Sequence, residues 1–258
     1  MAVITGAASG IGKALAMKCL KLGIKVVLAD NNQNKLKQCK DELKNFNNKI
    51  LICQTDVSKE IEIIQLANLT IEKFGSVHFL FNNAGIPGAL GPIWTQSTTD
   101  IEEVIQVNLM GTIYGIKTFI PIMLKQNDNC YVINTSAGAG LLTGAGLSAY
   151  KASKHAIVAV SEVLYADLKA IHASIHVSVL IPHWVNTDIA KNIKTDDKKI
   201  INDSIERLIN FGMPAETVAE KVFDAIKNRQ FYIFTHANEH LPKIKKRMET
   251  ILSIGNPC

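Results

Sequence analysis

A tyrosine and a lysine four residues apart, Tyr150 and Lys154, have the spacing that most directly suggests chemistry in this chain. They open a segment whose apolar residues recur at helical spacing, which predicts both side chains on one helix face, one turn apart. A lysine ammonium near a phenol favours the phenolate and lowers the tyrosine pKa. Such a phenol can exchange a proton with a substrate oxygen near neutral pH. Taken alone, the motif is equally compatible with a surface helix carrying a chance pair.

The start of the chain predicts a phosphate-binding turn. A short apolar run, Ala2–Ile4, leads into the glycine-rich segment Thr5–Gly12, and an apolar helical pattern follows from Ala14. Glycines allow a tight turn and close approach of the backbone, and a helix N-terminus offers free N–H groups and a positive dipole. The spacing is G-x-x-x-G-x-G, which differs from the general G-x-G-x-x-G fingerprint.

An acidic residue, Asp30, ends the next predicted strand, Lys25–Asp30, and lies 18 residues after Gly12. An acid near this distance binds the ribose 2′-hydroxyl of a dinucleotide. A carboxylate there would repel a 2′-phosphate, and the three residues that follow include no arginine. The pattern therefore favours NAD over NADP. The alternative, that Asp30 caps the helix expected from Lys35, does not explain the glycine turn.

Further apolar runs at 49–57, 77–81, 174–181 and 231–234 read as strands separated by helical patterns. Alternating strands and helices predict an α/β fold, a doubly wound parallel sheet of about seven strands with helices on both faces. Residues 1–258 are expected to form a single domain. Ligands should bind at the C-terminal ends of the strands, where the glycine turn and Asp30 also fall.

Composition argues against several other classes of protein. The net charge of +5 comes mostly from scattered lysines, and the cluster at 243–247 is expected to be a solvated helix face, not a nucleic-acid site. No apolar run approaches the ~20 residues of a membrane span, and no signal peptide is expected before the first motif. The five cysteines lack metal-like spacing. We therefore expect a cytoplasmic protein without a metal site, bound to neither nucleic acid nor membrane.

Four motifs together resemble the short-chain dehydrogenase/reductases, in that family's order and at its usual distances. The resemblance covers about residues 2–187. The motifs are Thr5-Gly-x-x-x-Gly-x-Gly12, Asn82-Asn-Ala-Gly85, Asn108 and Tyr150-x-x-x-Lys154. The resemblance implies a single-domain Rossmann fold and NAD(P)-dependent interconversion of an alcohol and a carbonyl.

The resemblance also implies a role for individual residues. Tyr150 would be the acid/base, and Lys154 would bind the nicotinamide ribose and lower the tyrosine pKa. Asn108 would hold a water of the proton relay, although a buried asparagine more often only satisfies backbone groups. Residues 188–212 resemble a substrate lid, with an apolar patch at Ile201, Ile205, Leu208 and Ile209. The expected cofactor-binding residues are Gly6, Ser9, Gly10, Ile11, Gly12, Asp30, Asp56, Val57, Asn83, Ala84, Gly85, Tyr150, Lys154, Pro182, Val185 and Thr187.

The chain departs from the family at the serine that orients the substrate. The family places this serine 13 residues before the tyrosine, and position 137 is alanine here. The neighbouring Ser136 is our candidate for the missing hydroxyl. Side chains alternate along a strand, so Ser136 should point away unless a bulge near Ala137–Gly138 turns it in. Thr143 or Ser148 are the other hydroxyls that could substitute.

A second departure is His183, where the family usually has glycine. We interpret it as an ordinary loop residue, with a proton acceptor beside the nicotinamide as the alternative.

The sequence therefore predicts an NAD(H)-dependent oxidoreductase that acts on a small, partly apolar alcohol or carbonyl, and the resemblance implies a homodimer or homotetramer. The rival hypothesis is an NAD(H)-binding sensor or scaffold with little turnover, and Ala137 is its sole support.

Overall fold

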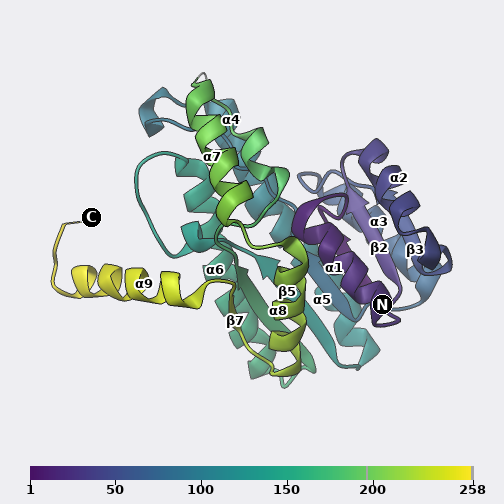
Figure 1. Cartoon of the computed structure of the whole chain (residues 1–258). Helices are drawn as coiled ribbons and strands as arrows, with labels where there is room; N and C mark the ends of the chain where they lie inside the picture. Colours follow the sequence, from purple (N-terminus) through teal and green to yellow (C-terminus); the bar gives the residue numbers. More distant parts are fainter. Residues whose placement is uncertain (196, 257–258) are drawn as a thin grey trace.

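Seven short strands form one sheet, and all neighbouring strands are parallel (Figure 1). The computed structural model describes residues 1–195 and 197–256, without the side chains at 198, 201, 205 and 208–210. The predicted lid patch at Ile201, Ile205, Leu208 and Ile209 lies outside these described side chains. The strands are β1 (Ala2–Thr5), β2 (Val26–Asp30), β3 (Ile50–Gln54), β4 (Phe79–Asn82), β5 (Cys130–Thr135), β6 (Ile175–Ile181) and β7 (Tyr232–Phe234).

The spatial order β3-β2-β1-β4-β5-β6-β7 confirms the predicted doubly wound sheet. The chain winds outward from β1 in one direction and from β4 in the other, so the order reverses between these two strands. Loops leave the sheet on opposite sides at such a point and open a crevice beyond the C-terminal strand ends. The glycine turn after β1 and the Asn82–Gly85 motif after β4 both lie at this crevice.

Helices cover both faces of the sheet, as the alternating pattern predicts (Figure 1). Apolar residues of α1, α2 and α8 pack on one face, and those of α3, α5 and α6 pack on the other. The helices are α1 (Gly10–Lys21), α2 (Gln33–Glu42), α3 (Glu60–Phe74), α4 (Thr98–Val104), α5 (Gly111–Gln126), α6 (Ser148–Ala170), α7 (Lys198–Phe211), α8 (Ala215–Lys227) and α9 (Ala237–Leu252).

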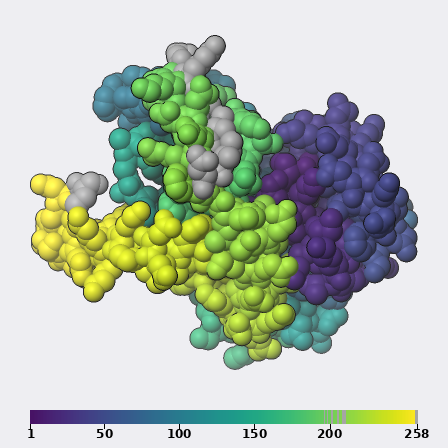
Figure 2. Space-filling view, viewed as in Figure 1, coloured from purple at the N-terminus to yellow at the C-terminus, as the bar shows by residue number. Residues whose placement is uncertain are grey.

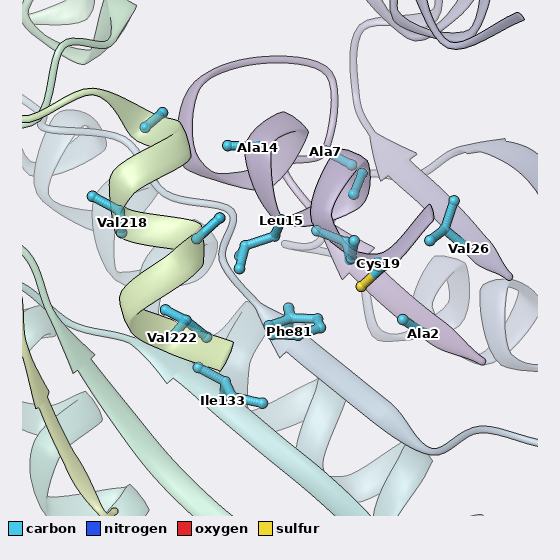
Figure 3. Packing of buried hydrophobic residues seen from close by; sticks show 14 of the residues in the cluster. Ala2, Ala7, Ala14, Leu15, Cys19, Val26, Phe81, Ile133, Val218 and Val222 are labelled. Carbon is cyan, nitrogen blue, oxygen red and sulfur yellow. The ribbon is translucent and has the colours of Figure 1, made fainter. Parts of the chain in front are cut away.

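The core on the α1/α8 face shows why strands with continuous apolar runs are buried here (Figure 3). Leu15 of α1 and Val222 of α8 are both completely buried, together with Phe81 of β4 and Ile133 of β5. Strands covered on both faces need no polar alternation, which explains why their sequences read as apolar runs.

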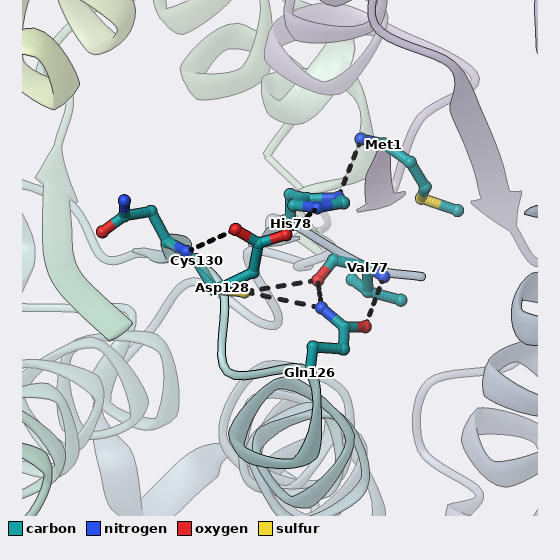
Figure 4. Close-up of polar contacts among 7 residues, drawn as sticks. Met1, Val77, His78, Gln126, Asp128 and Cys130 are labelled. Atoms are coloured by element: carbon teal, nitrogen blue, oxygen red, sulfur yellow. Dashed lines mark hydrogen bonds and ion pairs between the residues drawn. The ribbon is translucent and has the colours of Figure 1, made fainter. Parts of the chain in front are cut away.

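At the opposite end of the sheet, polar contacts tie β4 to the segment before β5 (Figure 4). The Gln126 side chain accepts a hydrogen bond from the Val77 amide at 2.8 Å and donates one to the Val77 carbonyl at 2.7 Å. His78 lies 3.3 Å from the Met1 nitrogen and 3.2 Å from Asp128. These contacts hold the N-terminal strand ends and leave the crevice at the other end for ligands.

The stretch Thr98–Gln126 is helical throughout, but a π-helical turn at Ile105–Met110 separates α4 from α5. By length and composition the stretch could cross a membrane, with a mean hydropathy of 1.3 over its most apolar window. The stretch is not an uninterrupted apolar run, because Gln106, Asn108 and Lys117 lie within it. In the fold, Phe119 and Met123 of this stretch are buried against the sheet.

The last helix, α9, leaves the body after β7 and projects to one side (Figures 1 and 2). The expectation of a solvated helix face at 243–247 is confirmed for Lys243, Lys245 and Lys246, which are exposed. The sequence interpretation did not identify the helix itself. The signal that could have found it is the helical spacing of Leu241, Ile244, Met248 and Ile251.

Candidate active site

A cleft of about 470 Å³ opens at the C-terminal ends of the central strands. Its lining includes most of the residues that sequence patterns nominate for the cofactor. Predicted residues in the lining are Gly6, Ser9, Gly10, Ile11, Asp30, Asp56, Val57, Asn83, Ala84, Gly85, Tyr150 and Pro182, with Thr187. The structure therefore brings together segments from the ends of β1, β2, β3, β4 and β6, as the fold requires of a dinucleotide site.

The glycine turn owes its shape to backbone conformations that other residues rarely adopt. Gly6 and Gly10 have φ values of +62° and +51°, in the left-handed region that favours glycine. Gly12 is needed for a different reason, because a Cβ there would lie 2.1 Å from the Gly6 carbonyl oxygen. Gly12 therefore closes the turn by packing, and Gly6 and Gly10 border the cleft.

The Asp30 carboxylate fastens the glycine turn to the end of β2. One oxygen accepts a hydrogen bond from the Ala8 amide at 3.2 Å, and the other accepts one from the Asn32 amide at 3.0 Å. Asp30 does not cap α2, since the Asn32 side chain accepts from the Lys35 amide instead. The carboxylate thus borders the cleft as expected. Lys35 also borders it, a residue that the search for an arginine overlooked.

The turn after β4 is joined to the end of β1. The Thr5 hydroxyl oxygen accepts hydrogen bonds from the Asn83 and Ala84 amides at 3.0 and 3.1 Å. The Asn83 side chain donates to the Thr5 carbonyl at 3.0 Å. These contacts place Asn83, Ala84 and Gly85 along the cleft between the glycine turn and α6.

Tyr150 and Lys154 share one face of α6, as their spacing predicts. The Lys154 ammonium lies 5.6 Å from the Tyr150 ring centroid and donates a 2.8 Å hydrogen bond to the Thr135 carbonyl. Lys154 is buried, and burial lowers the pKa of its ammonium to about 8. Tyr150 borders the cleft.

The expected direction of the tyrosine pKa shift is wrong for this structure. Burial raises the pKa of Tyr150 to about 12, because removal from water disfavours the charged phenolate. An added positive charge beside the phenol would lower its pKa again. Tyr150 and Lys154 therefore share the expected helix face, and the pKa of each depends on the charge of the molecule bound in the cleft.

Asn108 sits in the π-helical turn with no exposed surface. Its side-chain oxygen accepts from the Ile86 amide at 2.8 Å, and its side-chain nitrogen donates to the Ile86 carbonyl and the Ser153 hydroxyl, both at 3.0 Å. The side chain therefore satisfies backbone groups and ties the loop after β4 to α6. A Cβ at Gly85 would lie 3.2 Å from Asn108 Oδ1 and 3.3 Å from Lys154 Nζ, so the Asn108 and Lys154 side chains both pack against Gly85.

The Ser136 hydroxyl is directed away from the substrate side. It donates a 2.7 Å hydrogen bond to the Lys154 carbonyl and is almost completely buried. The bulge that would turn it in does not form, because the Ser136 and Gly138 amides donate in regular alternation to the Leu180 and Pro182 carbonyls at 2.8 Å. Ala137 has extended backbone with a φ of −166°.

The alternative hydroxyls are placed differently from Ser136. Ser148 donates its hydrogen to the Gln96 side chain at 2.9 Å, and Thr143 is exposed. Neither residue therefore places its hydroxyl at the position that Ala137 occupies.

The segment after β6 closes one side of the cleft. Thr187 packs on the glycine turn, since a Cβ at Gly10 would lie 2.9 Å from its methyl carbon. Val185 is not among the residues that line the cleft, since its side chain is buried in the apolar cluster and its backbone pairs with Met213, and its role as a cofactor residue stays a prediction. The His183 imidazole contacts Glu239 of α9 at 3.2 Å, which supports its interpretation as a structural loop residue.

Residues 188–194, at the start of the segment expected to be a substrate lid, border the cleft through Asp188, Ile189 and Asn192. Their backbone pairs with the loop after β4 through a Leu90 amide to Lys194 carbonyl bond of 2.9 Å. The Lys194 ammonium donates to Asp100 and Glu103 of α4 at 2.6 Å each. Ser136, the candidate for the missing hydroxyl, also borders the cleft, and the lining residues not named as site residues from the sequence are Asn31, Asn32, Lys35, Thr55, Ile86, Glu103, Val107, Thr135, Asp188, Ile189 and Asn192.

No group of three or more His, Cys, Asp or Glu side chains within the described residues has the arrangement of a metal site.

Comparisons with known proteins agree with this geometry. Residues 1–198 match the model of the short chain dehydrogenase family. The CLA biosynthesis dehydrogenase/reductase of Lactiplantibacillus plantarum is 32% identical, with 98% of this chain and 93% of that protein covered. The 3beta-hydroxysteroid dehydrogenase 2 of Eggerthella lenta is 30% identical over 77% of this chain and 75% of its own length.

A solved structure extends the similarity to the whole chain. The short chain dehydrogenase/reductase of Burkholderia phymatum in complex with NAD has 38% identity and a TM-score of 0.94, covering 100% of this chain and 95% of that one. Together with the crevice, the glycine turn and the Tyr150–Lys154 pair, these similarities show that the chain belongs to the short-chain dehydrogenase/reductase family of oxidoreductases.

Proposed function

We propose that the protein is an NAD(H)-dependent dehydrogenase/reductase in which Tyr150 moves the proton between an alcohol and a carbonyl. The observation that carries this proposal is Tyr150 at the edge of the cleft with the Lys154 ammonium 5.6 Å from its ring centroid. NAD, when bound, supplies the hydride acceptor at C4 of its nicotinamide. The residues present fit such a cofactor, because Gly6, Ser9 and Gly10 line the cleft at the N-terminus of α1, where free backbone N–H groups can bind a pyrophosphate.

Each polar group then has a defined task. The Tyr150 phenol donates its proton to a carbonyl oxygen, and its phenolate accepts the proton of an alcohol. The Lys154 ammonium stabilises the phenolate, and its bond to the Thr135 carbonyl fixes its position. Asn108 holds the loop after β4 against α6. The water-binding role that the family resemblance implies for Asn108 stays a prediction.

The substrate that fits best is a partly apolar secondary alcohol or the corresponding ketone. Ile86 and Val107 give the cleft apolar lining, and Ile93 and Trp94 in the loop after β4 add apolar side chains that are 60% and 84% exposed. A relative named for a hydroxysteroid supports the same substrate class. The experiment is to follow NADH absorbance with purified protein across a panel of secondary alcohols of increasing apolar size. Absence of NAD reduction with every member would contradict the proposal.

Ala137 supports a second candidate function. Because the Ser136 hydroxyl is bonded to the Lys154 carbonyl, the substrate-orienting serine of the family has no replacement at this position. An NAD(H)-binding sensor with little turnover is therefore the rival proposal. Tight calorimetric binding of NAD without oxidation of any alcohol in the panel would favour it.

The cytoplasmic location expected from the sequence also stays a proposal. Cys19, Cys39, Cys53 and Cys130 are free thiols in the described part of the chain, which suits a reducing compartment.

Cofactor choice gives the first prediction. NAD should bind more tightly than NADP because the Asp30 carboxylate would face the 2′-phosphate. Asp30→Ala should narrow the ratio of the two affinities on the order of tenfold, since juxtaposed like charges are costly. Isothermal titration calorimetry with both cofactors measures this ratio. Asp30→Asn is the matched control, because it removes the charge and keeps one oxygen for the Ala8 or Asn32 amide. Equal affinities of the unmodified protein for NAD and NADP would contradict the assignment.

Assembly gives the second prediction. The stretch Thr98–Gln126 and α6 carry apolar side chains on their outer sides, among them Leu124, Val163 and Tyr165, which are 40%, 59% and 45% exposed. We expect these helices to pair in a homodimer or homotetramer. Light scattering at micromolar concentration should give two or four times the 28.3 kDa chain mass.

A substitution tests where the subunits meet. Val163→Glu should reduce the mass, and Trp94→Glu, which adds the same charge at an exposed apolar site outside these helices, should not. A monomeric mass for the unmodified protein would overturn the expectation.

A further inference from the structure

The projecting helix α9 is bonded to the turn that follows β5. Arg247 of α9 donates a hydrogen bond from its guanidinium to the Leu141 carbonyl at 2.8 Å, although the two residues lie 106 positions apart in the sequence. The contact is partly buried, which strengthens a charged donor relative to one in open water. It joins the projecting helix to a segment that begins at Ala137, the position of the family's substrate-orienting serine.

That segment is a compact turn. The Gly140 amide donates to the Ala137 carbonyl at 2.8 Å, and the Leu141 amide donates to the Gly138 carbonyl at 3.1 Å. The Leu141 side chain packs on an apolar cluster that includes Val158 and Val179. One side of residue 141 is therefore held by the core and its carbonyl is held by α9, so the path of the turn depends on both.

A second contact fixes the base of α9 against the same turn. His240 has no exposed surface, and a Cβ at Gly138 would lie 2.4 Å from its Nε2. Its ring lies 4.6 Å from the His183 ring, and His183 in turn contacts Glu239. Burial lowers the pKa of His240 to about 4, so the imidazole is neutral at physiological pH. Only glycine at 138 leaves room for this ring.

We propose that α9 determines substrate specificity by holding the turn Ala137–Leu142 on the substrate side of Tyr150. Arg247 and His240 act as positioning residues, since both contact the turn and neither contacts Tyr150 in the described structure. This inference rests on the proposed oxidoreductase function for its catalytic readout. Its mechanical part, restraint of the turn by α9, stands without that function.

The mechanical part is tested by hydrogen–deuterium exchange. Arg247→Gln removes the charged donor, and the amides of Gly140 and Leu141 should then exchange about tenfold faster, because a charge-assisted bond typically contributes more than a neutral one. Lys246→Gln is the matched control, since it makes the same change of charge at the neighbouring, exposed position on α9. Arg247→Lys keeps the charge and should restore part of the protection. Equal exchange of the turn in Arg247→Gln and Lys246→Gln would overturn the proposal.

The catalytic part is tested by comparing kcat/KM for a small and a bulky secondary alcohol. Arg247→Gln should change the ratio of the two by about tenfold and leave the calorimetric affinity for NAD unchanged. A merely structural role of Arg247 would lower kcat/KM equally for the small and the bulky alcohol. That outcome would also overturn the proposal. If the unmodified protein oxidises no alcohol, the proposed function fails, and the exchange experiment still decides whether α9 restrains the turn.

Discussion

Tyr150→Phe is expected to reduce kcat/KM by about 10²–10⁴-fold, the usual contribution of a positioned general acid or base. The substitution removes one oxygen and leaves the ring, which lies 5.6 Å from the Lys154 ammonium, free to keep its packing. NAD affinity should therefore change little, and the loss should appear in the chemical step. Steady-state kinetics and NAD calorimetry on the same preparation separate the two. Retention of turnover on a substrate of the unmodified protein would refute the proton-transfer role.

The pH dependence of the unmodified protein follows from the same group. Burial raises the pKa of Tyr150 to about 12, so the protonated phenol predominates at neutral pH. Carbonyl reduction consumes that proton and should proceed at neutral pH. Alcohol oxidation needs the phenolate and should accelerate as the pH rises. Loss of this acceleration in the residual activity of Tyr150→Phe would assign it to the phenol.

Ala137→Ser is expected to raise kcat by up to about 10²-fold, the magnitude seen when a single hydrogen-bond donor to a developing oxyanion is removed elsewhere. Ala137 has extended backbone, so its side chain points to the opposite side from the Ser136 hydroxyl. A serine there would present its hydroxyl where the family places one. NAD affinity should stay nearly constant, because the new group acts on the substrate oxygen.

Ser136→Ala is the natural control for this gain. It removes the bond to the Lys154 carbonyl and should cost about 0.5–1.5 kcal/mol of stability, without the loss of rate expected for a substrate contact. If Ser136→Ala abolishes activity instead, its hydroxyl reaches the substrate and the assignment of the two positions is wrong. If neither the unmodified protein nor Ala137→Ser oxidises any alcohol, and both bind NAD tightly, the hypothesis of an NAD(H)-binding sensor is favoured.

The sheet and the cofactor cleft were predictable because their signals are local. A parallel strand covered on both faces is a continuous apolar run, and the glycine turn occupies eight consecutive residues, Thr5–Gly12. Asp30 follows at the end of the next strand, where chain geometry places it beside that turn. The fold could therefore be predicted from short segments of the sequence, each interpreted separately.

The features that sequence reasoning missed depend on contacts between distant segments. Lys194 forms ion pairs with Asp100 and Glu103, more than ninety positions away, and the residues around 194 do not predict these pairs. Arg247 reaches Leu141 in the same way. The direction of the Tyr150 pKa shift was missed for a related reason, because burial depends on the whole fold and a Tyr–Lys spacing does not report it.

The π-helical turn at Ile105–Met110 has a consequence for how the stretch Thr98–Gln126 meets its surroundings. A π turn accommodates one extra residue, and each residue of an α-helix rotates the chain by about 100°. The extra residue therefore shifts the faces of α5 by about 100° relative to an unbroken α-helical continuation of α4, and Val104 of α4 and Phe119 of α5 are both buried. One continuous helix can thus face the loop after β4 with its first half and the sheet with its second. Deleting a single residue at this turn would restore an unbroken α-helical phase and rotate Asn108 away from Ile86, even though α4 and α5 would keep their lengths.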